Sequence, residues 1–396
     1  MRSQRSTGAR GPPLRSPDRR RAVAARLKRC CAAVAVATAC ALAACDSRAP
    51  VAPGAEGTLN LYSWAEYFPT PVIHEFEAET GIKVNYSVFD SNDVAETTLS
   101  AGQSGFDLVT VNASPHLGRQ IPKGLWRPID FTKLRNMGNV DARLLQMLRR
   151  VDPGNRHAIP YMWGTIGLIY NPAKIRALMP DAPVDSLDMV FRPELIRRFD
   201  PCGVSVLSAW VDMLPLMSRY LGQADLNTDP KVLGELSATF ERVRPMIRRI
   251  TTSGYYDQLA RGELCLAIGY SADAMVARRR AKELETGVEI AFSQPRETVP
   301  VYIDAYAIPA GARHGEAALR FIDFTLRADI AAKLAQATGF AIANRAAIER
   351  LPPELRDNPI VYPSAAVRER FSLGRGYSLE ETRQLSRAWL RMKTGL

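Results

Sequence analysis

From residue 58 onward, apolar and polar side chains alternate and then recur at helical spacing, in a regular succession of segments. Alternation predicts a strand, whereas apolar residues three and four positions apart predict a helix. Strands are predicted over 58–62, 84–88 and 106–111, with helices over 70–81 and 92–101 between them. A strand–helix–strand–helix–strand order indicates a parallel sheet with helices on both faces.

The pattern changes after this first block. A second α/β block runs from about 163 to 280, whereas a strand predicted over 301–308 and a helix over 316–326 indicate a return to the first sheet. A last helix is predicted over 379–392. We therefore expect an α/β protein of two lobes, each a mixed, mainly parallel sheet flanked by helices. Several crossings between lobes would form a hinge, and hinged lobes close over small ligands.

The charge of the chain is concentrated at its N-terminus. The net charge is +11, and residues 1–44 contain ten Lys or Arg and a single Asp, a net charge of +9, which leaves +2 for the rest. A nearly neutral body offers no broad basic surface that could release counterions from a nucleic acid. Nucleic acid is therefore excluded as an expected partner.

An uncharged apolar run follows this basic segment, over 30–44. It is shorter than the roughly 20 residues that a membrane-spanning helix needs, so it is typical of an export signal. Its end, Leu42-Ala43-Ala44-Cys45, resembles the lipobox of bacterial lipoproteins, in which Cys45 would carry the lipid. The alternative is cleavage nearby without lipid. Asp46 resembles an inner-membrane retention signal, so we expect the protein in the periplasm, anchored to the inner membrane by lipid only.

Two cysteines are left in the body of the chain, Cys202 and Cys265. In an exported protein an even pair forms a disulfide by default. The alternative is two free, buried cysteines. We expect the disulfide.

Four carboxylates, far apart in sequence, have aromatic side chains close by. The acids are Glu66, Asp212, Asp273 and Asp304, and the aromatic residues are Trp64, Tyr67, Tyr270, Tyr302 and Phe340. A carboxylate only accepts hydrogen bonds and an ammonium only donates them, while aromatic faces attract cations and pack against methylene groups. A cleft that gathers these residues would therefore suit a flexible alkyl diammonium.

An enzyme is the main alternative class. The four histidines lie in no metal-ligand spacing and beside no candidate nucleophile, so we expect no metal site, no catalytic residue and no cofactor. Paired acids also serve glycoside hydrolysis, which leaves a hydrolase as the less favoured reading.

Several ordered motifs in the chain resemble those of the periplasmic polyamine-binding proteins of bacterial ABC transporters, and are most similar to the putrescine-binding members. The motifs are LNLYSWAEY (59–67), ETGIKV (79–84), FDSN (89–92), GFDLV (105–109), IPYMWGT (159–165), CGVS (202–205) and AIGY (267–270). The resemblance implies a two-lobed, type II-like periplasmic binding protein that delivers a polyamine to an ABC permease. A polyamine-sensing role, with ligand presented to a chemoreceptor or sensor kinase, is the alternative.

The resemblance also implies which residues contact the ligand. Carried over position by position, with Tyr67 added as a neighbouring aromatic residue, they are Trp64, Glu66, Tyr67, Asn112, Ser114, Asp212, Thr252, Tyr270, Asp273, Tyr302, Asp304 and Phe340. Every acidic position of the family's pattern is also acidic in this chain. Residues expected to line the cleft, such as Pro115 and Tyr270, differ from that pattern. Putrescine is therefore the expected ligand, with other di- or triamines as alternatives. We expect Asp273 and Asp304 to hold one end of the ligand, with Asp212 at the same end or linked to it through water. Glu66 is expected to lie nearer the other end.

These expectations define the organisation of the chain. The expected parts are a signal peptide over 1–44, a tether over 45–57, lobe 1 over 58–160 and 284–338, and lobe 2 over 161–283 and 339–396. We expect the protein to act as a monomer.

Overall fold

The computed structural model describes residues 57–101 and 104–395. The expected signal peptide, Cys45 and most of the tether lie outside the described residues. The strands are β1 (Thr58–Trp64), β2 (Lys83–Phe89), β3 (Leu108–Asn112), β4 (Ala158–Tyr170), β5 (Val204–Val206), β6 (Arg249–Ile250), β7 (Leu266–Tyr270), β8 (Ala291–Ser293), β9 (Val299–Ala307), β10 (Ala341–Ile342) and β11 (Phe371–Ser372).

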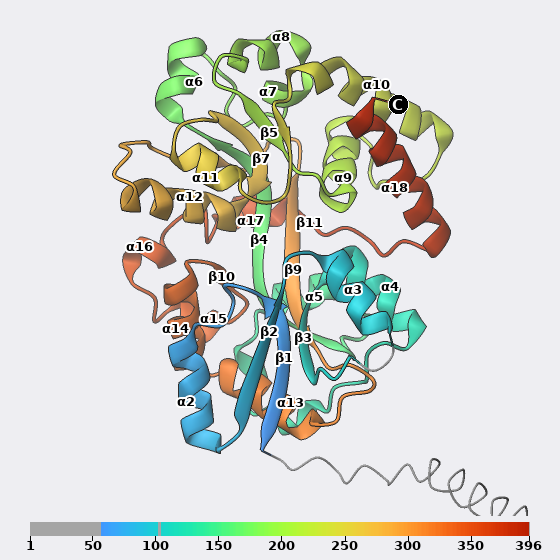
Figure 1. Ribbon diagram of the computed structural model, residues 1–396, viewed down its shortest axis with the longest axis vertical. Helices are drawn as coiled ribbons and strands as arrows, with labels where there is room; N and C mark the ends of the chain where they lie inside the picture. The colour runs from blue at the N-terminus through green and yellow to red at the C-terminus, as the bar shows by residue number, and fades with distance from the viewer. Residues whose placement is uncertain (1–56, 102–103, 396) are drawn as a thin grey trace, which may run out of the picture. The chain divides into compact units, whose positions relative to one another are not determined.

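The α-helices flank these strands (Figure 1). They are α2 (Thr70–Thr80), α3 (Asn92–Ser100), α4 (Gly118–Gln120), α5 (Ala142–Leu148), α6 (Pro172–Leu178), α7 (Asp188–Phe191), α8 (Pro193–Ile196), α9 (Trp210–Tyr220), α10 (Pro230–Val243), α11 (Tyr255–Ala260), α12 (Ser271–Glu283), α13 (Gly315–Thr325), α14 (Ala328–Thr338), α15 (Arg345–Ile348), α16 (Pro353–Arg356), α17 (Ala365–Glu369) and α18 (Leu379–Thr394).

The first block forms the predicted parallel sheet. β1 lies between β2 and β3 and is parallel to both. α2 starts with a proline in its first turn and ends at Gly81, whose φ of 72° places it in the left-handed region that glycine adopts without strain. α3 begins at Ser91, whose side chain accepts a hydrogen bond from the backbone N–H of Val94. Both capping positions are readable in the sequence, and the predicted strand–helix order is confirmed.

Two long strands join this sheet to the second one. The first part of β4 pairs with β9, whereas Ile166 to Tyr170 pair with β7. β9 also pairs with β3, antiparallel. β5 continues the second sheet, parallel to β7 and β6. β4 and β9, green and orange in Figure 1, therefore belong to the framework of both halves.

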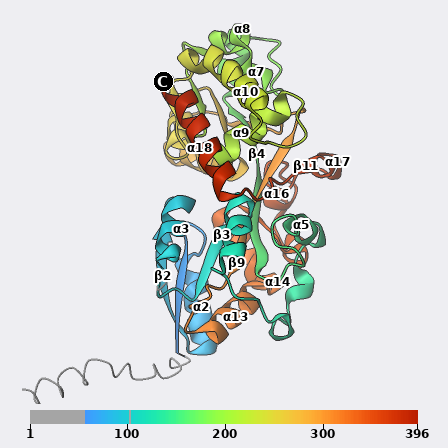
Figure 2. The ribbon, with the colours of Figure 1, turned by 90° about the vertical axis from the view of Figure 1, so that its right-hand side faces the viewer.

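Two separate hydrophobic cores correspond to the two lobes. One core contains Leu59, Leu108 and Phe321, and the other contains Leu168, Phe240 and Trp389. α18, red in Figures 1 and 2, packs beside α9 and α10 in the second core. Much of the segment 340–373, expected in lobe 2, instead packs in the first core, so the expected boundary at 339 does not follow the cores there. The lobe boundaries as a set stay a prediction.

The disulfide between Cys202 and Cys265 is present and confirms the predicted pairing. Cys202 lies two residues before β5 and Cys265 lies directly before β7. The disulfide thus links the starts of two strands that are neighbours in the sheet. Among the described residues, no helix is both long and apolar enough to cross a membrane.

Candidate polyamine site

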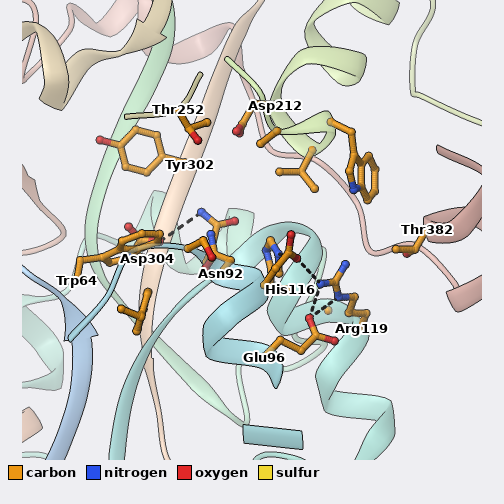
Figure 3. A pocket seen from close by; sticks show the side chains of 18 of the residues that line it. Trp64, Asn92, Glu96, His116, Arg119, Asp212, Thr252, Tyr302, Asp304 and Thr382 are labelled. Atoms are coloured by element: carbon orange, nitrogen blue, oxygen red, sulfur yellow. Dashed lines mark hydrogen bonds and ion pairs between the residues drawn. The ribbon is translucent and has the colours of Figure 1, made fainter. Parts of the chain in front are cut away.

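A large cavity of about 1660 Å³ lies against both hydrophobic cores. Eleven of the twelve candidate residues line it: Trp64, Glu66, Tyr67, Asn112, Asp212, Thr252, Tyr270, Asp273, Tyr302, Asp304 and Phe340. Figure 3 shows Trp64, Asp212, Thr252, Tyr302 and Asp304 around the same space. Side chains that lie up to 276 positions apart in the chain thus meet in one cavity, from Trp64 to Phe340.

Ser114 is the exception. It is not among the residues that line the cavity, and its hydroxyl donates a hydrogen bond to the backbone carbonyl of Arg375 at 3.0 Å. The residue thus ties the segment after β3 to the segment before α18. Its expected role as a ligand contact is not supported by this geometry.

Asp304 is the most deeply buried of the candidate acids, with 3% of its surface exposed. It sits on β9 opposite Asn112 of β3, and the Asn112 Nδ2 group lies 3.3 Å from Asp304 Oδ1. The hydroxyl of Tyr67 donates a hydrogen bond to the other carboxylate oxygen. Burial raises the pKa of Asp304 to about 6, although both hydrogen bonds act to lower it.

Asp212 lies in the first turn of α9, at the cavity wall of the second core. The hydroxyl of Tyr270 donates to Asp212 Oδ2 at 2.6 Å. Burial raises the pKa of Asp212 to about 6; the bond from Tyr270 opposes the rise, and the negative charge of Asp304 adds to it. Asp212 and Asp304 are therefore close enough for their charges to repel.

Asp273 lies in the first turn of α12. The hydroxyl of Tyr255 donates to Asp273 Oδ2 at 2.6 Å. Burial raises the pKa of Asp273 to about 7; the Tyr255 bond lowers it, and the charge of Glu66 raises it. Which of these acids would share one end of a ligand stays a prediction.

Glu66 is the only exposed acid of the four candidates. Its Oε2 lies 3.5 Å from an Arg279 guanidinium nitrogen on α12. The loop after β1, which packs with the first core, is therefore linked by an ion pair to the helix that carries Asp273. Glu66 already has a cationic partner, whereas the other three acids have none among the described residues.

Aromatic rings form the walls between these acids. Tyr270 and Tyr302 meet edge to face, with ring centroids 5.4 Å apart. The pKa of Tyr302 is raised well above its usual value, first by burial and then by the negative charges of Asp304 and Asp273. Tyr67 meets Phe340 edge to face at 6.0 Å. Such edge-to-face geometry is typical of aromatic pairs.

Asn112 and Thr252 are the two uncharged polar candidates that line the cavity. Asn112 donates to Asp304 and so helps to hold it, as described above. The Thr252 hydroxyl oxygen lies 3.1 Å from that of Ser208. Both residues line the cavity, and their contact with a ligand stays a prediction.

Three features of the site had been missed or given little weight. Tyr255, which holds Asp273, and Arg279, which pairs with Glu66, were not predicted. Trp210, whose side chain is half-buried, also lines the cavity and was not among the predicted site residues. No local motif marks Tyr255 or Arg279, because each depends on packing between separate elements. The proximity of Trp210 to Asp212 in sequence was the one usable signal.

Comparison with known proteins places this geometry in a family. Residues 72–363 match the model for bacterial extracellular solute-binding proteins. The chain belongs to this family. The putrescine-binding periplasmic protein SpuD of Pseudomonas aeruginosa (strain UCBPP-PA14) is 38% identical over 360 residues, which cover 90% of this chain and 98% of SpuD. The putrescine-binding periplasmic protein PotF of Escherichia coli K12 is 39% identical over 340 residues, 85% of this chain and 92% of PotF.

Solved structures of this solute-binding family agree with the fold. The spermidine/putrescine ABC transporter substrate-binding protein PotD of Streptococcus pneumoniae superposes with a TM-score of 0.72, covering 85% of this chain and 99% of PotD at 23% identity. At this identity the likeness shows the fold alone. The expected two-lobed α/β binding-protein fold and the resemblance read from the sequence motifs are confirmed.

The family consists of solute-binding proteins, and the two relatives above are putrescine-binding periplasmic proteins. Within residues 57–101 and 104–395, no group of three or more His, Cys, Asp or Glu side chains is arranged to hold a metal ion.

Proposed function

We propose that this protein captures a polyamine in the cavity and delivers it to the permease of an ABC transporter. Putrescine is the first candidate, because two relatives of high coverage are putrescine-binding proteins. Other di- and triamines are the alternatives. The proposed contacts are the eleven cavity-lining residues given above, with the acids as the principal ligands.

One observation supports the proposal above all others. Asp212, Asp273 and Asp304 each accept a hydrogen bond from a tyrosine hydroxyl, and no Lys or Arg of the described chain forms an ion pair with any of them. An enclosed carboxylate without a cation is costly to ionise, which explains the raised pKa values. A ligand with two or more ammonium groups supplies the missing positive charges.

The energetics favour a cation with an apolar stem. A hydrogen bond to a charged group contributes about 1.5–3 kcal/mol, and an aromatic face over an ammonium contributes about 0.5–2 kcal/mol. The tyrosine and tryptophan rings also cover the methylene groups between the ammonium groups. An anionic ligand would instead add negative charge beside three unpaired acids.

A panel of amines tests the proposal. We expect putrescine, and more weakly cadaverine, agmatine or spermidine, to raise the melting temperature of the protein from Asp46 onward. A ligand at 100 times its Kd adds about 2.7 kcal/mol to the free energy of unfolding. Calorimetry then gives the Kd, and chromatography of the recovered amine separates binding from hydrolysis. Melting curves that are indifferent to every amine would overturn the proposal.

We also propose that the protein works in the periplasm as a monomer, held at the inner membrane by lipid on Cys45. The lipobox-like Leu42-Ala43-Ala44-Cys45 and the following Asp46 support this location. Several acyl chains on one residue give stable anchoring, whereas a single chain is marginal. Cys45→Ala is expected to move the protein out of the membrane fraction or to block its maturation. A wild-type protein found entirely in the soluble periplasmic fraction would contradict the anchor.

A further inference from the structure

Tyr255 lies behind the cavity wall yet bonds to two residues that form it. The residue opens α11 and has 1% of its surface exposed. Its hydroxyl donates to Asp273 Oδ2 at 2.6 Å and accepts a hydrogen bond from the backbone N–H of Tyr270 at 3.1 Å. A phenol has a single hydrogen to donate, and the carboxylate takes it. The direction of both bonds is therefore fixed.

These bonds connect two of the acids. Tyr255 holds Asp273 on one side and the backbone of Tyr270 on the other, and the Tyr270 hydroxyl donates to Asp212 Oδ2 at 2.6 Å. The acids of α9 and α12 are thus linked through β7 by two phenols. A shift of the Tyr255 hydroxyl would disturb Asp273 directly and Asp212 through Tyr270.

The ring of Tyr255 has room only because residue 269 is glycine. A Cβ at Gly269 would lie 2.7 Å from Cε2 of the Tyr255 ring, and closer still to its hydroxyl. Non-bonded carbon atoms are at their best separation at about 3.5–4.0 Å. The backbone of β7 therefore approaches the ring closely, and this approach places the hydroxyl between Tyr270 and Asp273.

We propose that Tyr255 is a positioning residue of the polyamine site, which orients the carboxylate of Asp273 and favours the ionised form that receives an ammonium group. The inference rests on the proposed function and adds a residue outside the cavity to it. A Lys or Arg at the same place would also hold the carboxylate, but it would cancel the charge that the ligand needs. A phenol supplies a hydrogen bond without a positive charge.

The surroundings of Asp273 make this donor important. Burial raises the pKa of Asp273 to about 7 and the charge of Glu66 raises it further, whereas the hydrogen bond from Tyr255 lowers it. The titratable groups near Asp273 are Tyr255 and Tyr256 of α11, Tyr270 of β7, Tyr302 of β9, and Glu66 after β1 with its partner Arg279. Loss of the donor is expected to move the protonation of Asp273 to higher pH.

Tyr255→Phe tests the inference, with Tyr220→Phe as a matched control. Tyr220 also donates to an aspartate, Asp188 Oδ1 at 2.7 Å, but neither residue lines the cavity. Calorimetric titration with putrescine from pH 6 to 8.5 should show Tyr255→Phe binding about tenfold more weakly than wild type at pH 7, about 1.4 kcal/mol. The loss should shrink as the pH rises, because Asp273 then ionises without the donor. Tyr220→Phe should follow the wild-type curve.

The pH profile separates positioning from a merely structural role. A loss of affinity that is equal at every pH, or a Tyr255→Phe curve that matches the control, overturns the inference while the proposed function stands. A wild-type protein that binds no amine overturns both. Should Tyr255→Phe not fold, 3-fluorotyrosine at residue 255 keeps the ring and strengthens the donor. It should move the pH midpoint of binding downward, and an unmoved midpoint overturns the inference.

Discussion

Asp304 is the most buried of the four candidate acids and accepts the most side-chain hydrogen bonds, from Tyr67 and Asn112. Its side chain therefore gives the most direct test of the site. Asp304→Asn keeps the shape but removes the charge that would meet an ammonium. We expect binding of putrescine to weaken by about 2–5 kcal/mol, the usual loss when one member of a buried charge pair is removed. Asp185→Asn, which affects an exposed ion pair with Arg296, is the calorimetric control. An unchanged Kd in Asp304→Asn would remove this residue from the site.

The raised pKa values of the acids predict opposite effects of pH on stability and on binding. The pKa is raised to about 6 for Asp212 and Asp304 and to about 7 for Asp273, each from an ordinary value of 3.8. At pH values between 3.8 and about 6 to 7, these three carboxyl groups keep protons in the folded protein that they have lost in the unfolded chain. These groups therefore stabilise the ligand-free protein at low pH, and this contribution is lost as the pH rises through about 6 to 7.

An alkyl ammonium stays charged over this range, as the Lys side chain does with a pKa of about 10.4. Binding must therefore displace protons from the acids at low pH. We expect the ligand-induced rise in melting temperature to shrink between pH 8 and pH 5, and calorimetry in buffers of different ionisation enthalpy to show protons released on binding. An equal thermal shift at both pH values would contradict this prediction.

At the scale of elements, a glycine in β4 makes room for a wall of the site. A Cβ at Gly164 would lie 2.6 Å from Cζ of Tyr302 and 2.7 Å from the Ser271 hydroxyl oxygen. Gly164→Ala should therefore displace the Tyr302 ring from its position in the cavity wall. Overpacking of this kind costs about 1–3 kcal/mol, which we expect to appear as weaker binding and lower stability. Gly234→Ala in α10, where a Cβ meets nothing within 4 Å, is the control.

The elements themselves were readable from the sequence, whereas contacts between them were not. Alternation marks β1 and β2, and capping residues mark α2 and α3, because these signals are local. The bond between Tyr255 and Asp273 depends on how α11 packs against α12, which no periodicity records. Ser114 was carried over by resemblance, but its hydroxyl bonds to Arg375 across 261 positions of the chain. The four acids, among the 41 Asp and Glu residues of the chain, were singled out by the resemblance and by the aromatic residues close to them in sequence.

At the scale of the whole molecule, the candidate contacts are divided between two hydrophobic cores. Trp64 and Phe340 pack with the first core, and Tyr270 packs with the second. No single lobe carries the complete set of acids and rings. Binding affinity and the relative placement of the lobes should therefore be coupled, since a ligand shifts a conformational equilibrium by its differential affinity for the two states.

This coupling predicts a measurable change of size. β4 and β9 pass between the two cores and are the connections over which hinge closure around a ligand would take place. We expect saturating putrescine to lower the radius of gyration in small-angle scattering, because a closed pair of lobes lets each ammonium contact acids from both. Asp304→Asn at the same putrescine concentration should keep the larger radius. A wild-type protein that binds putrescine with an unchanged radius would show that the acids meet in the cavity without closure, and the hinge would then have no part in capture.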